Sequence, residues 1–233
     1  MVNFPRYAIY YVPPHDSVLD RFGSLLLGYD AWTSDDLPFP DGIERTVPDW
    51  REVTKDARKY GFHATLKAPI ALADGKAETD LLAACKAFAD TPRAIPVIRP
   101  VIEEISGFIA VIPVERSAEL EQLERDCVMA FDSLRAPLSP EDRARRNPDK
   151  LTARQRDHLD RWGYPYVMEE FRFHMTLTCR LSPERRAPLL ANLRSRFAAA
   201  GLATLAIDTI ALFRQDDNAS RFRIIGHWPL RGP

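Results

Sequence analysis

Residues 59–69, KYGFHATLKAP, and residues 171–180, FRFHMTLTCR, contain the pattern that decides the fold: phenylalanine followed by His-x-Thr-Leu, present twice. Successive side chains of a β-strand point to opposite faces. In the first copy, His63, Thr65 and Lys67 therefore share one face. The opposite face is apolar and consists of Phe62, Ala64, Leu66 and Ala68.

The second copy separates polar from apolar side chains in the same way. One face holds Arg172, His174, Thr176 and Thr178. The other face holds Phe171, Phe173, Met175, Leu177 and Cys179. A single His-x-Thr on a strand is more often structural than catalytic, whereas two matched copies favour a paired site.

The chain around each copy repeats one outline of a strand, a helix and a pair of strands. In the first half we expect strands over 6–12, 62–72, 94–105 and 108–114 and helices over about 16–27, 50–60, 76–90 and 117–134. In the second half we expect strands over 171–181, 202–213 and 221–228 and a helix over about 183–200. This outline predicts an α+β fold, a single bilobal and duplicated domain over 1–233 with two antiparallel sheets and flanking helices around a central cleft.

The expected halves, about 1–134 and 167–233, are separated by a charged helical insert at about 135–166. Residues 143–161 contain seven Lys or Arg against three acids. Such a segment is typical of a solvated helical hairpin. A lid that carries positive charge over an anionic substrate is the alternative, because long inserts in compact domains are often functional.

Composition limits the classes of partner. The 233 residues carry a formal net charge of −1, so no overall positive field holds a long nucleic acid. The chain contains no apolar run of about 20 residues, no signal-peptide pattern and only three separated cysteines, so we expect a cytoplasmic protein without a membrane partner. A small phosphorylated substrate is compatible with this nearly neutral net charge. Composition does not determine the oligomeric state.

The paired histidines point to acid–base chemistry. An imidazole with an ordinary pKa near 6.5 takes either protonation state, so His63 and His174 can divide the work of base and acid at a phosphoryl centre. Thr65 and Thr176 could donate to phosphate oxygens. Lys67 and Arg172 could add positive charge to the substrate-binding site. The alternatives are threonines present for β-propensity and cations at strand ends.

Other chemistries lack their motifs. The sequence contains no H-E-x-x-H or H-x-H, no G-x-x-x-x-G-K-[ST] loop and no G-x-G-x-x-G fingerprint. A serine or cysteine nucleophile elbow is also missing. We therefore expect neither a metal site nor a cofactor.

The two motifs FHATL and FHMTL resemble the paired H-x-[ST]-x motifs of the 2H phosphoesterase superfamily, over essentially the whole chain. The first motif in its context, KYGFHATLKAP, resembles more narrowly the branch encoded in bacterial phosphonate-utilisation operons. The resemblance implies a pseudo-twofold bilobal fold with His63 and His174 as catalytic residues and Thr65 and Thr176 as their hydroxyl partners.

The activity implied by this resemblance is metal-independent hydrolysis of a cyclic phosphodiester, such as a nucleotide or ribose cyclic phosphate in phosphonate metabolism. Two alternatives remain open at this point. One is a non-catalytic protein that binds nucleotides or RNA ends, and the other is an RNA-end ligase.

Overall fold

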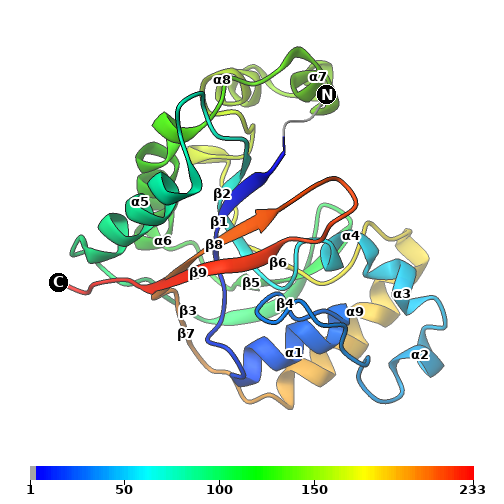
Figure 1. Ribbon diagram of the computed structural model, residues 1–233. Coiled ribbons are helices and arrows are strands. Elements are labelled where there is room, and N and C mark those ends of the chain that lie inside the picture. Colours follow the sequence, from blue (N-terminus) through cyan, green and yellow to red (C-terminus); the bar gives the residue numbers. More distant parts are fainter. Residues whose placement is uncertain (1–3) are drawn as a thin grey trace.

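The computed structural model describes residues 4–233, and the predicted α+β class is confirmed (Figure 1). Seven antiparallel strands form one sheet in the order β4-β5-β6-β2-β1-β8-β9. Their bounds are β1 (Arg6–Tyr11), β2 (Ala64–Ile70), β4 (Pro100–Ile105), β5 (Phe108–Pro113), β6 (Met175–Thr176), β8 (Thr209–Gln215) and β9 (Arg223–Pro229). A second, two-stranded antiparallel sheet consists of β3 (Val97–Ile98) and β7 (Leu205–Ala206).

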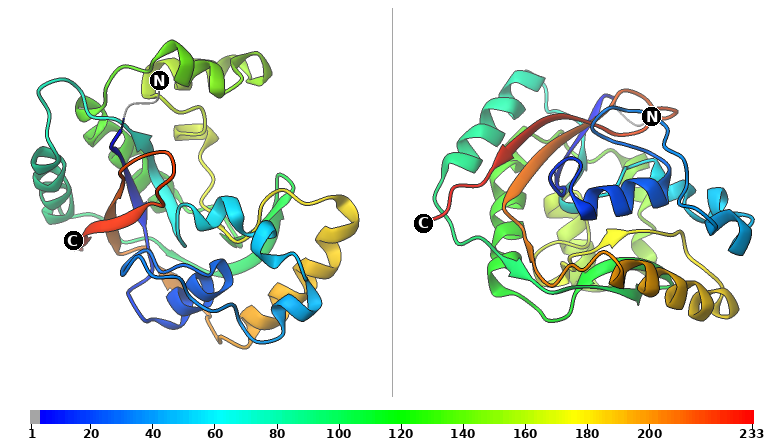
Figure 2. Two further views of the ribbon diagram at one scale, coloured as in Figure 1. Left: turned by 45° about the vertical axis from the view of Figure 1, so that its right-hand side comes forward. Right: turned by 90° about the horizontal axis from the view of Figure 1, so that it is seen from below.

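Helices flank the sheet in two groups. The longer ones are α1 (Val18–Leu27), α5 (Glu78–Asp90), α6 (Ala118–Ala130), α8 (Ala153–Trp162) and α9 (Pro183–Ala198). The shorter ones are α2 (Ile43–Thr46), α3 (Trp50–Val53), α4 (Lys55–Arg58) and α7 (Pro140–Arg145), with 3-10 turns η1 (Asp132–Leu134), η2 (Pro148–Lys150) and η3 (Met168–Glu170). Figure 1 shows α5, α6, α7 and α8 on one side and α1, α3 and α9 on the other. Helix α9 packs along β4 (Figure 2).

The sheet order shows that strands are exchanged between the two expected halves. Hairpin β4–β5 belongs to the first half of the sequence but pairs with β6 from the second. Hairpin β8–β9 belongs to the second half but pairs with β1 from the first. The boundaries of the two halves, 1–134 and 167–233, stay a prediction. In the sheet, each group of neighbouring strands contains strands from both halves.

Strand β6 joins these two groups and is much shorter than the strand expected over 171–181. Only Ala64 and Met175 are paired between β2 and β6. We call this pair the seam. Regular pairing ends after Thr176, because the amides of Leu177 and Thr178 both donate to Ile109 O of β5 (2.9 and 3.3 Å) and that of Cys179 donates to Val53 O outside the sheet (2.7 Å).

A β-bulge in β2 changes which face its side chains occupy. Tyr10 pairs with Thr65, but the next residue of β1, Ile9, pairs with Lys67, so β2 carries one extra residue here. Cross-strand partners share a face, and Tyr10 and Ile9 lie on opposite faces of β1. Lys67 therefore points away from Thr65, and its predicted place on the polar face beside His63 is wrong.

Helix α1 packs closely against the segment that enters β2. Phe62 is buried, and a Cβ added at Gly23 of α1 would lie 2.1 Å from its ring. The missing side chain thus allows the helix to approach the residue that precedes His63. Among residues 4–233, no helix is both long and apolar enough to cross a bilayer.

We expect Gly23→Ala to destabilise the protein. The new methyl group must displace the Phe62 ring at a cost of about 1–3 kcal/mol, which exceeds the gain in helix propensity of about 1 kcal/mol or less. Urea denaturation would measure the free energy of unfolding. Gly232→Ala, where a Cβ meets nothing within 4 Å, is the control. A Gly23→Ala variant as stable as the control would contradict the close packing.

Candidate active site

The two His-x-Thr motifs meet at the seam. Ala64 pairs with Met175 in antiparallel register; His63 and His174 each lie one residue before a paired strand, and Thr65 and Thr176 lie one residue after the pair. Ala64 and Met175 are fully buried, whereas the four polar side chains are partly exposed. The seam therefore places both motifs on one face, related by a local twofold.

Both imidazoles are oriented by the same backbone contact. The Nδ1–H of His63 donates to Gly61 O (2.9 Å), and the Nδ1–H of His174 donates to Arg172 O (2.7 Å). A carbonyl oxygen only accepts, so Nδ1 carries the proton in each ring and Nε2 is left for chemistry. Nε2 of His63 lies 3.4 Å from the Thr65 hydroxyl.

Burial keeps both histidines neutral. Desolvation lowers the pKa of His63 to about 4, the hydrogen bond that His63 donates to Gly61 O opposes this, and the charge of His174 lowers the pKa further. Desolvation also lowers the pKa of His174, against the hydrogen bond to Arg172. His63 is additionally stacked on the ring of Tyr10, with ring centroids 3.8 Å apart. At neutral pH both Nε2 atoms are therefore acceptors.

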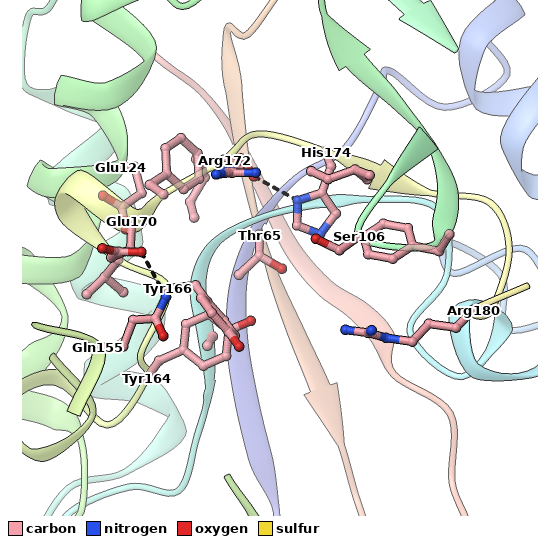
Figure 3. Close-up of a pocket in the computed structure, with 16 residues that line it drawn as sticks. Thr65, Ser106, Glu124, Gln155, Tyr164, Tyr166, Glu170, Arg172, His174 and Arg180 are labelled. Carbon is pink, nitrogen blue, oxygen red and sulfur yellow. Dashed lines mark hydrogen bonds between the residues drawn. The ribbon is translucent and has the colours of Figure 1, made fainter. Parts of the chain in front are cut away.

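A cavity of about 310 Å³ opens beside the seam (Figure 3). His174, Thr65, Arg172 and Arg180 contribute to its wall. His63 and Thr176 adjoin this wall through the seam and do not line the cavity themselves. The part of the wall around His174 thus combines an imidazole, a hydroxyl and two guanidinium groups, which suits an anionic ligand.

The opposite part of the wall contains carboxyl, amide and phenol groups. Figure 3 shows Glu124, Glu170 and Gln155 across the cavity from His174 and Arg180. Gln155 Nε2 donates to the Glu170 carboxylate (2.9 Å). Two tyrosines of the insert region, Tyr164 and Tyr166, also line the cavity.

The charged insert therefore contributes side chains to the wall. The interpretation as a solvated helical hairpin describes α7 and α8. Arg143 of α7 is paired with Asp160 of α8 on the exposed surface (Nε to Oδ1, 2.7 Å). The groups that line the 310 Å³ cavity from 135–166 are aromatic or amide in character, as in Tyr164 and Gln155.

The two predicted cations have different surroundings. Arg172 lines the cavity. Lys67 is 3% exposed, and its ammonium donates to Val128 O (3.0 Å) and to Asp132 Oδ1 (2.9 Å) on the helical side of β2. The β-bulge explains this position, and we leave Lys67 out of the candidate site.

Sequence reasoning missed Glu124, which is 1% exposed in the cavity wall. Desolvation raises its pKa to about 8, although the Met168 amide donates to its Oε2 (3.2 Å) and acts in the opposite direction. A signal was present, because Leu120, Glu124 and Val128 follow each other at i, i+4 and i+8 on the buried face of α6. A carboxyl group in such a stripe marks an unusual environment.

No group of three or more His, Cys, Asp or Glu side chains within residues 4–233 is arranged to hold a metal ion.

Comparisons with known proteins identify relatives over most of the chain. A family model described as "Protein of unknown function (DUF1045)" matches residues 65–223. A ribose 1,5-bisphosphate phosphokinase PhnN of Janthinobacterium sp. (strain Marseille) is 38% identical over 221 residues, which cover 92% of this chain and 48% of that protein. A protein of the same name from Laribacter hongkongensis (strain HLHK9) is 32% identical over 224 residues, 94% of this chain and 50% of that one. The chain thus spans about half the length of the curated relatives it matches.

Solved structures are similar at low sequence identity. A crystal structure of E. coli LigT complexed with NADP+ gives a TM-score of 0.44 at 12% identity and covers 99% of each chain. A crystal structure of a phosphoesterase gives 0.43 at 10% identity and covers 98% of this chain and 99% of that one.

We expect Glu124→Gln to remove a pH dependence of stability. The pKa of Glu124 is raised on folding from 4.5 to about 8, so its stabilising contribution is complete below pH 4.5 and is lost as the pH rises to about 8. The glutamine keeps an oxygen for the Met168 amide and does not titrate. Between pH 5 and 8 the melting temperature of the wild type should therefore fall more than that of the variant.

Glu119→Gln, on the exposed face of the same helix, serves as the control for this experiment. It should follow the wild-type curve. Parallel melting curves for the wild type and Glu124→Gln would show that Glu124 is ionised in the folded protein across this range.

Proposed function

The chain belongs to the DUF1045 family, and we propose that it is a metal-independent phosphodiesterase that hydrolyses a small cyclic phosphodiester, a nucleotide or ribose cyclic phosphate. The observation that carries the proposal is the meeting of both His-x-Thr motifs at the seam, each with its histidine Nδ1 bonded to a backbone carbonyl so that Nε2 is the unprotonated nitrogen. The proposal extends to phosphonate metabolism through the relatives, whose printed activity concerns a phosphorylated ribose. The chain has no G-x-x-x-x-G-K-[ST] loop, so we do not extend their kinase activity to it.

In the proposed reaction, His63 is the base and His174 is the acid. Burial lowers the pKa of His63 to about 4, so its Nε2 is free to take a proton from the attacking water. The water oxygen forms a bond to phosphorus while the bond to the ring oxygen breaks. The Nε2–H of protonated His174 gives its proton to that oxygen. A phosphomonoester with a free hydroxyl group results, and proton exchange with solvent restores both rings.

Arg172 and the threonines support the charge that develops on phosphorus. Thr65 lies in the cavity wall with Arg172, where a hydroxyl and a guanidinium can both donate to non-bridging oxygens. The negative phosphate also raises the pKa of the adjacent His174, which favours the imidazolium form that an acid needs. General acid–base catalysis of this type contributes about 10²–10⁴-fold for each group.

Replacing either histidine with alanine should lower kcat by at least about 10²-fold while the variant stays folded. The assay uses nucleoside 2′,3′-cyclic phosphates and a ribose cyclic phosphate in the presence of chelator. His15→Ala, on the exposed surface, is the control. Wild-type activity in both single variants would exclude this mechanism, and binding without any turnover would favour the non-catalytic binder.

The dependence of kcat/KM on pH should be bell-shaped with an acidic optimum. Activity rises as His63 loses its proton near pH 4 and falls as His174 loses its proton below its ordinary pKa of 6.5. The optimum for kcat should lie at higher pH, because bound phosphate stabilises the imidazolium of His174. An optimum of kcat/KM above pH 8 would contradict the assignment of base and acid.

A further inference from the structure

A second cavity, of about 50 Å³, lies under the charged insert and is lined by four arginines from three parts of the chain. Arg6 comes from β1, Arg135 follows η1, and Arg145 and Arg146 lie at the end of α7. Asp142 is the one acidic residue among the described residues that line it. We call this second cavity the arginine cavity.

Two of these arginines are already compensated by carboxylates. Arg145 is paired with Asp142. Arg135 donates through Nε to Asp132 Oδ1 (2.9 Å). These pairs hold the wall of the arginine cavity in place and contribute little net positive charge to it.

The other two arginines have no carboxylate within ion-pair distance among residues 4–233. Arg6 donates through Nε (3.1 Å) and through Nη2 to the amide oxygen of Gln215, which carries no charge, and its Nη1 is left for another acceptor. Arg146 lies over the ring of Tyr164, with its Cζ 5.0 Å from the centroid. Both guanidinium groups thus keep donors for a further acceptor.

The positive charge in this cavity is not balanced. Burial lowers the pKa of Arg6, Tyr60 and Tyr10 oppose this, and the charges of Arg145 and Arg146 lower it further. Like charges that converge in a partly buried place repel each other more strongly than on the open surface. A bound anion would remove this repulsion, and the planar fork of a guanidinium group matches a phosphate.

Two series of ring contacts connect the unpaired arginines with the candidate active site. Arg6 Cζ lies 5.5 Å from the ring centroid of Phe222, which stacks on Tyr60 at 5.0 Å, and the Tyr60 ring lies 6.1 Å from that of His63. Arg146 contacts Tyr164, which lines the 310 Å³ cavity together with Thr65 and His174.

We propose that Arg6 and Arg146 bind a second phosphate group of the substrate, which is then a small sugar or nucleotide that carries a phosphomonoester in addition to its cyclic diester. This inference rests on the proposed function. The distribution of charge supports this placement, since the opposite wall of the 310 Å³ cavity presents the Glu170 carboxylate, which does not suit a phosphate. A ligand with two phosphates therefore has one favourable orientation.

The first experiment measures binding of inorganic phosphate to the intact chain by calorimetry and does not depend on catalysis. We expect two sites in the wild type, one at the histidines and one in the arginine cavity. Arg146→Gln and Arg6→Gln should each weaken the second site by about tenfold or more, because each removes a charge-assisted hydrogen bond. Arg143→Gln, whose guanidinium is paired with Asp160, is the control and should bind as the wild type does.

The second experiment compares adenosine 2′,3′-cyclic phosphate with and without a 5′-phosphate. The wild type should prefer the 5′-phosphorylated compound by about tenfold or more in kcat/KM, and Arg146→Gln should bring this ratio close to one while turnover of the other compound stays unchanged. The Arg146 side chain contacts the Tyr164 ring and makes no hydrogen bond within residues 4–233, whereas Arg6 is bonded to buried Gln215 between β1 and β8. Arg146→Gln should therefore fold even if Arg6→Gln does not.

Three outcomes would overturn the inference. A single phosphate site in the wild type would exclude an anion site in the arginine cavity. Equal kcat/KM for the two compounds would exclude a second phosphate on the substrate, and inorganic phosphate that alters turnover of both compounds equally would identify a separate effector instead. If neither compound is hydrolysed, the proposed function fails, and the calorimetry still decides whether the arginine cavity binds phosphate.

Discussion

The backbone pairing of Ala64 with Met175 is the constraint on which the rest of the site depends. It is a single pair, but both strands are held on their other sides, β2 by β1 and β6 by β5. The two side chains of the seam are fully buried beneath the sheet, so a shift of register by one residue would bury four polar groups and expose two apolar ones. The relative position of the histidines is therefore set by core packing and requires no contact between the histidines themselves.

The charges around the 310 Å³ cavity differ between its two ends, so each end suits a different part of a ligand. The imidazoles lie in a desolvated place that favours their neutral forms, and Arg172 and Arg180 provide positive charge next to them. Glu124, on the far wall, is kept protonated by burial. A ligand that enters this cavity meets donors for an anion at one end and groups that suit neutral oxygen atoms at the other.

Much of this arrangement could be predicted from local pattern, and the failures have physical causes. Alternation along a strand was enough to bring each histidine and its threonine to one face, because this rule needs only the two motifs. The same rule failed for Lys67, because the bulge opposite Ile9 inserts one residue and nothing in KYGFHATLKAP marks it. The short β6 was also hidden, since its end is fixed by amides that bond to Ile109 and Val53, far away in the sequence.

Long-range contacts likewise decide which charges matter. The charged insert was visible from composition, but only the tertiary structure brings its unpaired Arg146 into one cavity with Arg6, which is far away in the sequence. Glu124 was recognisable in principle from its place in an apolar helical stripe, but the cavity that it faces requires η3 and the insert. Sequence patterns thus predict elements and faces, whereas bulges, strand ends and ion pairing depend on tertiary structure.

The exchange of hairpins between the two halves has a consequence for biosynthesis. As the chain leaves the ribosome, β1 and β2 can pair early, but β1 keeps an open edge until β8 is made, and β2 keeps one until β6 is made. Contacts of such long sequence separation form slowly, and open strand edges promote association between chains. The nascent chain therefore carries its first histidine motif in an unfinished, aggregation-prone intermediate until β6 and β8 have been synthesised, and the face that bears both histidine motifs cannot assemble before then.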